Sequence, residues 1–186
     1  MIEVTRWHLR MDAPEALRRA AAFSGPVEIR RVAVAVPEFS RFLYLAVGWR
    51  WHWVDRLVWT WADWTRFLAR PEIETWVAWI GGAPAGYYEL DRRPGGITEL
   101  LLFGLLPSFI GRGLGGHLLT HAVQRAWEGG ATAVTLNTCS LDHPSARAAY
   151  LARGFRLDRE ETVPRELPPP VDGPWAGAGL PLPERP

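Results

Sequence analysis

The sequence predicts a single α+β domain built around one mostly antiparallel β-sheet. Its 186 residues are a usual length for one domain, and 48% hydrophobic with 22% charged residues is the composition of a globular protein. Strand patterns joined by short turns fill residues 75–106, which is typical of an antiparallel meander. Helix and strand patterns alternate from residue 112 to residue 163, so helices are expected to cover the sheet.

Local signals place the expected elements in order along the chain. Proline at position 14, directly after Asp12-Ala13, predicts a helix through about Ala22. Apolar residues spaced three and four apart after Pro37 predict a second helix that Gly48 ends. The remaining expected elements are strand 27–36, helix 61–69, strands 75–80, 85–91 and 97–106, helix 112–127, strand 131–137, helix 144–152 and strand 155–163.

Composition also suggests the limits of the domain. We expect residues 1–26 to form an N-terminal extension packed on the domain, and residues 27–163 to form the domain itself. Residues 164–186 hold eight of the sixteen prolines and show no apolar periodicity, which predicts an extended tail.

Charge and cysteine content exclude several classes of function. All twenty-one basic residues are arginines scattered along the chain, and the net charge of +1 gives no basic stripe for nucleic acid. No segment approaches the ~20 apolar residues of a membrane span. A single cysteine, Cys139, and the lack of a secretory signal predict a cytoplasmic protein without membrane or nucleic-acid partners.

A glycine-rich segment joins strand 97–106 to the helix that follows it. Its glycines are Gly111, Gly113, Gly115 and Gly116. Free N–H groups at a helix N terminus attract phosphate, and glycines let a pyrophosphate approach the backbone closely. No Gly-Lys-Ser/Thr follows, so the segment is not a P-loop.

The same glycines satisfy the dinucleotide fingerprint G-x-G-x-x-G. A Rossmann fold requires an acidic residue roughly 20 positions later, where this sequence has Leu136-Asn137-Thr138. The antiparallel meander before the loop also disagrees with a parallel βαβ unit. A nicotinamide-dependent oxidoreductase therefore remains only a remote alternative.

These motifs resemble the GCN5-related N-acetyltransferase (GNAT) superfamily over about residues 27–163. Residues 110–115 match its phosphate loop, Arg/Gln-x-x-Gly-x-Gly/Ala, and strand 134–137 followed by Tyr150 and Gly154-Phe155 matches a later segment. Residues 138–144 resemble a bacterial subgroup. The chain departs from the pattern twice: Ile110 replaces the Arg or Gln, for which Arg112 is the expected substitute, and His143 replaces the usual Asn.

The resemblance implies a mixed, mostly antiparallel sheet, flanked by helices and splayed between the fourth and fifth core strands. The pantetheine arm of acetyl-CoA, the cosubstrate, would lie in that gap and pair with strand backbone. Gly104 suits a bulge or a close backbone approach there, and a neighbouring N–H would polarise the thioester. The implied acetyl-CoA-binding residues are Phe103, Gly104, Leu105, Leu106, Ile110, Gly111, Arg112, Gly113, Leu114, Gly115, Gly116, Asn137 and His143.

Direct acetyl transfer to an amine requires a base and an acid. Glu99 lies in a hydrophobic run, where burial raises a carboxyl pKa, so it is the candidate base, directly or through water; a surface ion pair is the alternative. Tyr150 matches the family's acid position, with core packing as the alternative. Cys139 follows the strand end near the expected thioester, so an acyl-cysteine intermediate is a further, less favoured hypothesis.

A tryptophan cluster between residues 49 and 64 marks the candidate acceptor site. Trp51, Trp53 and Asp55 are its predicted substrate-binding residues, on the assumption that an extended segment sends the rings to one side. Aromatic faces beside a carboxylate suit an aromatic or hydrophobic amine. Packing in the core or in a homodimer interface is the alternative role.

The leading hypothesis is an acetyl-CoA-dependent N-acetyltransferase acting on a small-molecule primary amine. A protein N-terminal or lysine acetyltransferase, and a non-catalytic acyl-CoA sensor, are the alternatives. His117 and His121 have zinc-like spacing but no third ligand, so no metal is expected.

Overall fold

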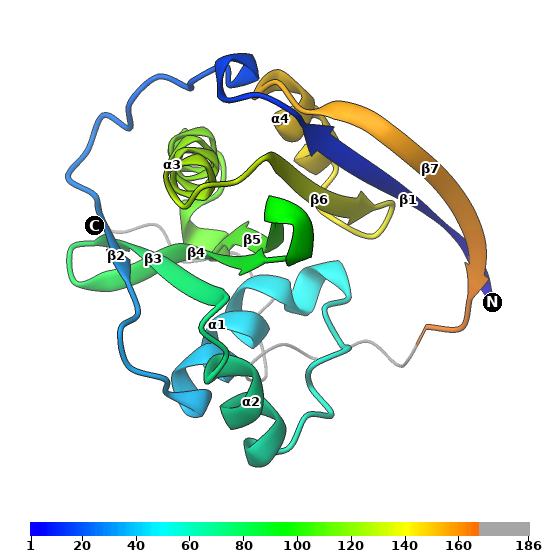
Figure 1. The fold of residues 1–186 in the computed structure, drawn as a ribbon. Helices are drawn as coiled ribbons and strands as arrows, with labels where there is room; N and C mark the ends of the chain where they lie inside the picture. Colours follow the sequence, from blue (N-terminus) through cyan, green and yellow to red (C-terminus); the bar gives the residue numbers. More distant parts are fainter. Residues whose placement is uncertain (168–186) are drawn as a thin grey trace.

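The computed structural model describes residues 1–167 and shows a seven-stranded sheet with helices on both faces (Figure 1). The predicted tail lies outside the described residues from position 168 onward. The strands are β1 (Ile2–Met11), β2 (Glu28–Arg31), β3 (Ile73–Ile80), β4 (Ala83–Arg92), β5 (Ile97–Leu105), β6 (Ala133–Cys139) and β7 (Arg156–Arg165). The helices are α1 (Pro37–Gly48), α2 (Trp61–Leu68), α3 (Leu114–Glu128) and α4 (Ala146–Ala152), with short 3-10 turns η1 (Pro14–Ala16), η2 (Trp49–Trp51), η3 (Pro94–Gly96) and η4 (Pro107–Phe109).

The strand order is β2-β3-β4-β5-β6-β1-β7, with β5 and β6 parallel and every other pair antiparallel. β5 and β6 pair only from Ile97 with Ala133 to Glu99 with Thr135. Beyond Glu99 the two strands diverge. The predicted α+β class and the predicted splay are therefore both confirmed.

The first strand differs most from the sequence prediction. Residues 2–11, placed by the sequence in an extension that packs on the domain, form a strand inside the sheet. β1 pairs with β6 on one side, with His8 opposite Asn137, and with β7 on the other. Its side chains Val4, Leu9 and Met11 are each 1% exposed. Figure 1 shows β1 and β7 running side by side at one end of the sheet.

The predicted helix through Ala22 is wrong: only the turn η1 forms. Past this turn, the N–H of Arg18 donates to the carbonyl of Arg153, and that of Ala20 to the Thr120 hydroxyl, both at 3.0 Å. These long-range partners take the place of helical hydrogen bonds, which satisfies the backbone equally well.

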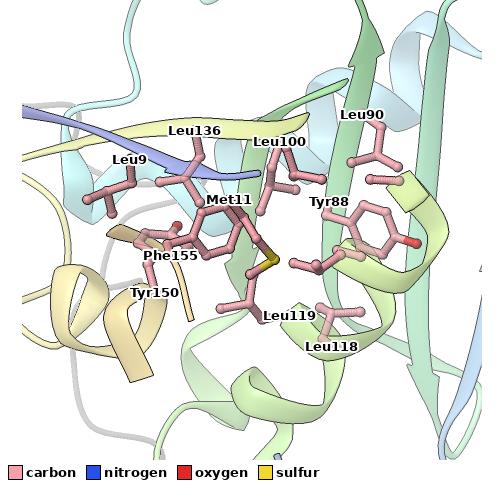
Figure 2. Packing of buried hydrophobic residues seen from close by; sticks show 14 of the residues in the cluster. Leu9, Met11, Tyr88, Leu90, Leu100, Leu118, Leu119, Leu136, Tyr150 and Phe155 are labelled. Atoms are coloured by element: carbon pink, nitrogen blue, oxygen red, sulfur yellow. The ribbon is translucent and has the colours of Figure 1, made fainter. Parts of the chain in front are cut away.

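Two hydrophobic clusters hold the helices to opposite faces of the sheet. The larger packs α3 and α4 against the strands, and Figure 2 shows Leu118 of α3 near Tyr88 and Leu119 near Met11. The smaller contains Leu43 and Val47 of α1 with Val77 and Tyr87. This arrangement leaves the diverging ends of β5 and β6 uncovered, between α3 and α4 on one side and the α1–α2 segment on the other.

Candidate active site

A cavity of about 510 Å³ lies where β5 and β6 separate. It reaches from the N terminus of α3, along the two strand ends, to the segment between α1 and α2. The chain contributes these residues to its walls: Arg6, Tyr44, Trp51, His52, Trp53, Asp55, Arg56, residues 100–105, Ile110, Gly111, Gly115, Gly116, Asn137, Cys139, Leu141, Asp142, His143, Ser145, Ala146, Ala149, Tyr150 and Arg165.

The β5 wall presents free backbone groups to the cavity. The N–H of Leu106 donates to the carbonyl of Ala85 at 3.0 Å, which continues the β4–β5 ladder. Because hydrogen bonds alternate along an antiparallel pair, Leu102 and Gly104 also bond to β4, and the N–H and C=O groups of Phe103 and Leu105 face the gap. The β5 edge is therefore open for another extended chain.

On the β6 wall, one residue has backbone N–H and C=O groups that are free to bind a ligand. Ser140 donates its N–H to the carbonyl of Thr5, so by the same alternation the backbone groups of Asn137 and Cys139 face the gap. Asp142 satisfies both groups of Cys139: its carboxylate accepts from the Cys139 N–H at 2.9 Å, and its own N–H donates to the Cys139 carbonyl. Asn137 is left to pair with a ligand.

The bulge in β5 is at Leu101 and not at Gly104. Glu89 pairs with Leu102 and Leu90 with Leu100, so Leu101 is the extra residue. Gly104 is instead a site of close approach, because a Cβ there would overlap the Val47 side chain of α1. The glycine lets α1 pack tightly against the cavity wall.

The glycine loop leaves its backbone accessible. Gly111 and Gly113 have φ values of 82° and 83°, and an added Cβ at either position would meet no atom within 4 Å. Gly113 is the N-cap of α3 and provides no capping side chain, so the first-turn N–H groups are available to an anion. Arg112 is exposed, lies over the Phe109 ring and does not line the cavity.

Glu99 lies one side chain away from the cavity. Its carboxylate accepts hydrogen bonds from Arg93 Nη2 at 2.7 Å and from Asn137 Nδ2 at 3.4 Å, and its side chain is 19% exposed. Asn137 lines the cavity and Glu99 does not. Direct contact between Glu99 and an acceptor is therefore not what the structure shows, and a proton must reach Glu99 through water.

Tyr150 lines the cavity from α4, with its ring edge-on to Phe103 and Phe155. Burial raises the pKa of its hydroxyl, and the Asp142 charge raises it further. The phenol thus keeps its proton at neutral pH. Among residues 1–167 the hydroxyl has no hydrogen-bond partner, so it is free to donate to a ligand.

Cys139 also lines the cavity, and burial followed by the nearby Asp142 carboxylate raises the pKa of its thiol. A thiol is a poor nucleophile compared with its thiolate. This environment argues against an acyl-cysteine intermediate.

The acceptor end of the cavity is not built from an extended segment, as the sequence suggested. Trp49–Trp51 form the turn η2, and His52 follows in the left-handed region with φ 55°. Trp51 lies edge-on to His143, with the ring centroids 4.9 Å apart, and both rings line the cavity. Trp53 instead packs against Gly48, Tyr44 and Tyr87. Both rings line the cavity, but only Trp53 is tied to the core.

His143 keeps a hydrogen-bond donor where the family pattern has Asn. The N–H of Ser145 donates to His143 Nδ1 at 3.1 Å, so Nδ1 is an acceptor and the proton of the neutral ring is on Nε2. Nε2–H can therefore replace an amide N–H.

A buried ion pair stabilises residues 49–64, called here the tryptophan segment. Arg56 Nη1 donates to Glu89 at 2.7 Å, and their side chains are 9% and 1% exposed. The guanidinium lies over the rings of Phe67 and Trp59 at 4.3 and 4.9 Å. Trp59 and Trp64 thus belong to the packing around Arg56.

Most of the predicted site residues line one cavity, and some do not. Glu99, Leu106, Arg112, Gly113 and Leu114 lie outside its lining. Sequence reasoning missed Arg6 and Arg165, because their positions depend on where β1 and β7 enter the sheet. It also missed Tyr44, whose helical spacing resembles ordinary core packing.

In the described part of the chain, no group of three or more His, Cys, Asp or Glu side chains is arranged to hold a metal. His121 Nδ1 instead hydrogen-bonds the Tyr88 hydroxyl at 2.8 Å. None of the helices within residues 1–167 is long and apolar enough to cross a membrane.

A mixed sheet that splays beside a glycine-rich helix start defines the class of this fold, an α+β domain. The chain belongs to the acetyltransferase (GNAT) family, whose model matches residues 39–155. Mycothiol acetyltransferase from Corynebacterium efficiens is 26% identical over 161 residues, which are 80% of this chain and 53% of the relative. The chain thus spans about half the length of that curated relative.

Solved structures share the fold. A GCN5-related N-acetyltransferase from Kribbella flavida has 22% identity and a TM-score of 0.61, over 85% of this chain and 56% of that one. A GCN5-related N-acetyltransferase from Sphaerobacter thermophilus has 15% identity and a TM-score of 0.64, over 84% and 49%. An aminoglycoside acetyltransferase from an uncultured soil sample has 14% identity and a TM-score of 0.57, over 68% and 86%.

Proposed function

We propose that the protein transfers the acetyl group of acetyl-CoA directly to a primary amine of a small, aromatic or hydrophobic molecule. The observation that carries this proposal is the continuity of the cavity. One space joins an uncapped, glycine-rich helix N terminus, two open strand edges and an aromatic pocket.

The residues present fit acetyl-CoA. Gly111, Gly115 and the first-turn N–H groups of α3 would hold the pyrophosphate, because a Cβ added at Gly111 would meet no atom within 4 Å and one added at Gly115 would meet only Leu105, at 3.6 Å. The free backbone groups of Phe103, Leu105 and Asn137 would pair with the amides of the pantetheine arm. When bound, acetyl-CoA supplies the thioester that is transferred.

Three groups of this chain would carry the transfer. The Leu105 or Phe103 N–H would stabilise negative charge on the thioester oxygen. Glu99, through water, would accept the proton that the amine loses as its nitrogen bonds to the acetyl carbon. Tyr150 would donate a proton to the sulfur as the C–S bond breaks.

The acceptor class follows from the walls of the aromatic pocket. Tyr44, Trp51 and Trp53 offer ring faces, and Asp55 lies at the mouth with a side chain 77% exposed. Such a site suits a cation with an apolar body. The Corynebacterium efficiens relative is named for mycothiol and not for a protein acceptor, which supports a small-molecule acceptor.

The direct test is release of free CoA thiol from acetyl-CoA in the presence of a panel of amines and peptides. We expect release with aromatic or hydrophobic primary amines and little release without an acceptor. Release only with peptides would make the protein a protein acetyltransferase. Binding of CoA without release for any acceptor would make it a sensor.

Replacing Gly115 tests the phosphate site. Its φ is helical, and an added Cβ would make only an ordinary contact, 3.6 Å from Leu105, so the helix should tolerate Gly115→Ala and Gly115→Val. Because the new atoms project into the cavity, we expect CoA affinity to fall in the order Gly, Ala, Val, by about tenfold or more for Val. Calorimetric titration measures the affinity, and thermal unfolding checks the fold.

The matched control is Gln124→Val, on the same helix but away from the cavity. It should leave CoA affinity unchanged. Equal affinity in the wild type and a folded Gly115→Val variant would place the pyrophosphate elsewhere.

Alanine at the two tryptophans should separate binding from packing. Trp51 lines the cavity beside His143, so Trp51→Ala should raise KM for the amine severalfold and leave KM for acetyl-CoA and the Tm nearly unchanged. Trp53 packs against the core, so Trp53→Ala should lower stability by about 2 kcal/mol or more. Steady-state kinetics with both substrates and thermal unfolding distinguish the two effects. An unchanged amine KM in Trp51→Ala would assign that ring to packing as well.

A further inference from the structure

Arg153 lies against the start of α3. A Cβ added to Gly116, in the first turn of that helix, would be 3.3 Å from Arg153 Nη1. Gly116 lines the cavity, and Arg153 lies just outside its lining. On α4, Ala146 and Ala149 line the cavity as well, and Arg153 follows Ala149 by four residues, which places it on the same face one turn further on.

The charge of Arg153 is unbalanced in this position. Its Nε is buried and has no hydrogen-bond partner, and no carboxylate of residues 1–167 forms an ion pair with its guanidinium. The N terminus of a helix carries partial positive charge, so a cation beside it is unfavourable unless an anion lies between them. Leaving a buried charged donor unpaired costs further free energy.

The backbone of Arg153 is also fixed. Its carbonyl accepts the N–H of Arg18 at 3.0 Å, and its own N–H donates to the carbonyl of Tyr150. The chain thus holds a partly buried guanidinium without an ion-pair partner among residues 1–167 beside the start of α3. An anionic ligand at the helix N terminus would supply both missing partners.

We propose that Arg153 binds the pyrophosphate of CoA together with the N terminus of α3. It would provide the cationic side chain that the family pattern places at position 110, where this chain has Ile110. Arg112, the substitute suggested by the sequence, lies over Phe109 instead. This inference rests on the proposed function, since it assumes that the cavity binds CoA.

The test is calorimetric titration of wild type and Arg153→Met with CoA, dephospho-CoA and pantetheine. Both CoA and dephospho-CoA carry the pyrophosphate, and pantetheine carries no phosphate. We expect Arg153→Met to raise Kd about tenfold or more for the first two ligands and to leave pantetheine binding unchanged. Arg153→Lys should restore part of the affinity, because charge is kept without the bidentate geometry.

A second readout is the stability of the free protein. Because Arg153 has no counter-ion, Arg153→Met should not lower the Tm without ligand, but it should reduce the Tm increase that CoA produces. The control is Arg147→Met, since Arg147 is on α4 and its Nε is also buried without a hydrogen-bond partner, but its guanidinium lies over the Trp7 ring. It should bind CoA as the wild type does.

The outcomes separate this inference from the proposed function. If the wild type binds no CoA, the proposed function fails and this inference fails with it. If the wild type binds CoA and Arg153→Met binds it equally well, only the role of Arg153 is wrong. A loss confined to CoA, with dephospho-CoA unaffected, would assign Arg153 to the 3′-phosphate and overturn the proposal.

Discussion

Replacing Tyr150 by Phe should lower kcat by the order of 10²-fold and leave the Kd for acetyl-CoA nearly unchanged. The ring lines the cavity, and burial keeps its hydroxyl protonated by raising its pKa, so it is suited to protonate a leaving thiolate. No described residue hydrogen-bonds the hydroxyl. Removing the hydroxyl therefore leaves no hydrogen-bond partner unsatisfied, and the Tm should stay within about 2 °C of the wild type. Single-turnover and steady-state rates measure the effect.

Tyr87→Phe is the matched control. Its hydroxyl is likewise buried without a hydrogen-bond partner, but Tyr87 does not line the cavity. The same substitution there should leave kcat unchanged. If Tyr150→Phe reacted at the wild-type rate, Tyr150 would have only a packing role in the core. Another group would then have to supply the proton to the sulfur.

The second large effect is expected on stability, at the ion pair between Arg56 and Glu89. Arg56→Met leaves a carboxylate alone in the core, and breaking a buried pair from one side costs about 3 to 5 kcal/mol. Urea unfolding measures this loss. The control is Arg66→Met, because Arg66 pairs with Asp63 on the exposed face of α2 and its loss should leave the free energy of unfolding nearly unchanged.

The destabilisation by Arg56→Met should depend on pH. Burial already raises the pKa of Glu89 above its ordinary value of 4.5, and loss of the guanidinium removes the main group that opposes this rise. With the folded pKa above the unfolded one, the folded state holds the extra proton, so stability falls as pH rises past about 4.5. The variant should therefore lose more stability relative to the wild type at pH 7 than at pH 4.

Adding Glu89→Gln to the Arg56→Met variant removes the titrating group. The double variant should show no such difference between pH 4 and pH 7. A loss in Arg56→Met that is equal at both pH values would mean that the aromatic contacts of Arg56, and not its charge, stabilise the tryptophan segment.

Much of the fold could be predicted from local sequence, because its signals act within a few residues. Pro37 begins α1 and Gly48 ends it, and the short turns between residues 80 and 97 fix the meander. The glycines before α3 indicate the phosphate end of the cavity because a helix N terminus attracts anions wherever it lies in a fold. Local chemistry alone was sufficient for these elements.

The place of β1 could not be predicted in this way. Its pattern identifies an apolar segment, but its partners lie more than 120 residues away, on β6 and β7. The helix expected after Pro14 failed for a related reason, since Arg18 and Ala20 find hydrogen-bond partners on α4 and α3. Backbone groups are satisfied by any hydrogen-bond partner, so tertiary contacts can override the local helix propensity of a segment.

The sequence by itself determined the glycine-rich start of α3 and the aromatic character of residues 49–64, since each is a property of residue type and spacing, and the family resemblance pointed to Tyr150. Only the tertiary structure decided that Glu99 lies behind Asn137, that Trp51 lines the site without joining the core as Trp53 does, and that Arg153 reaches the start of α3. These facts depend on distances between elements far apart in the chain. Such distances are set by the packing of the whole sheet, so no local sequence pattern predicts them.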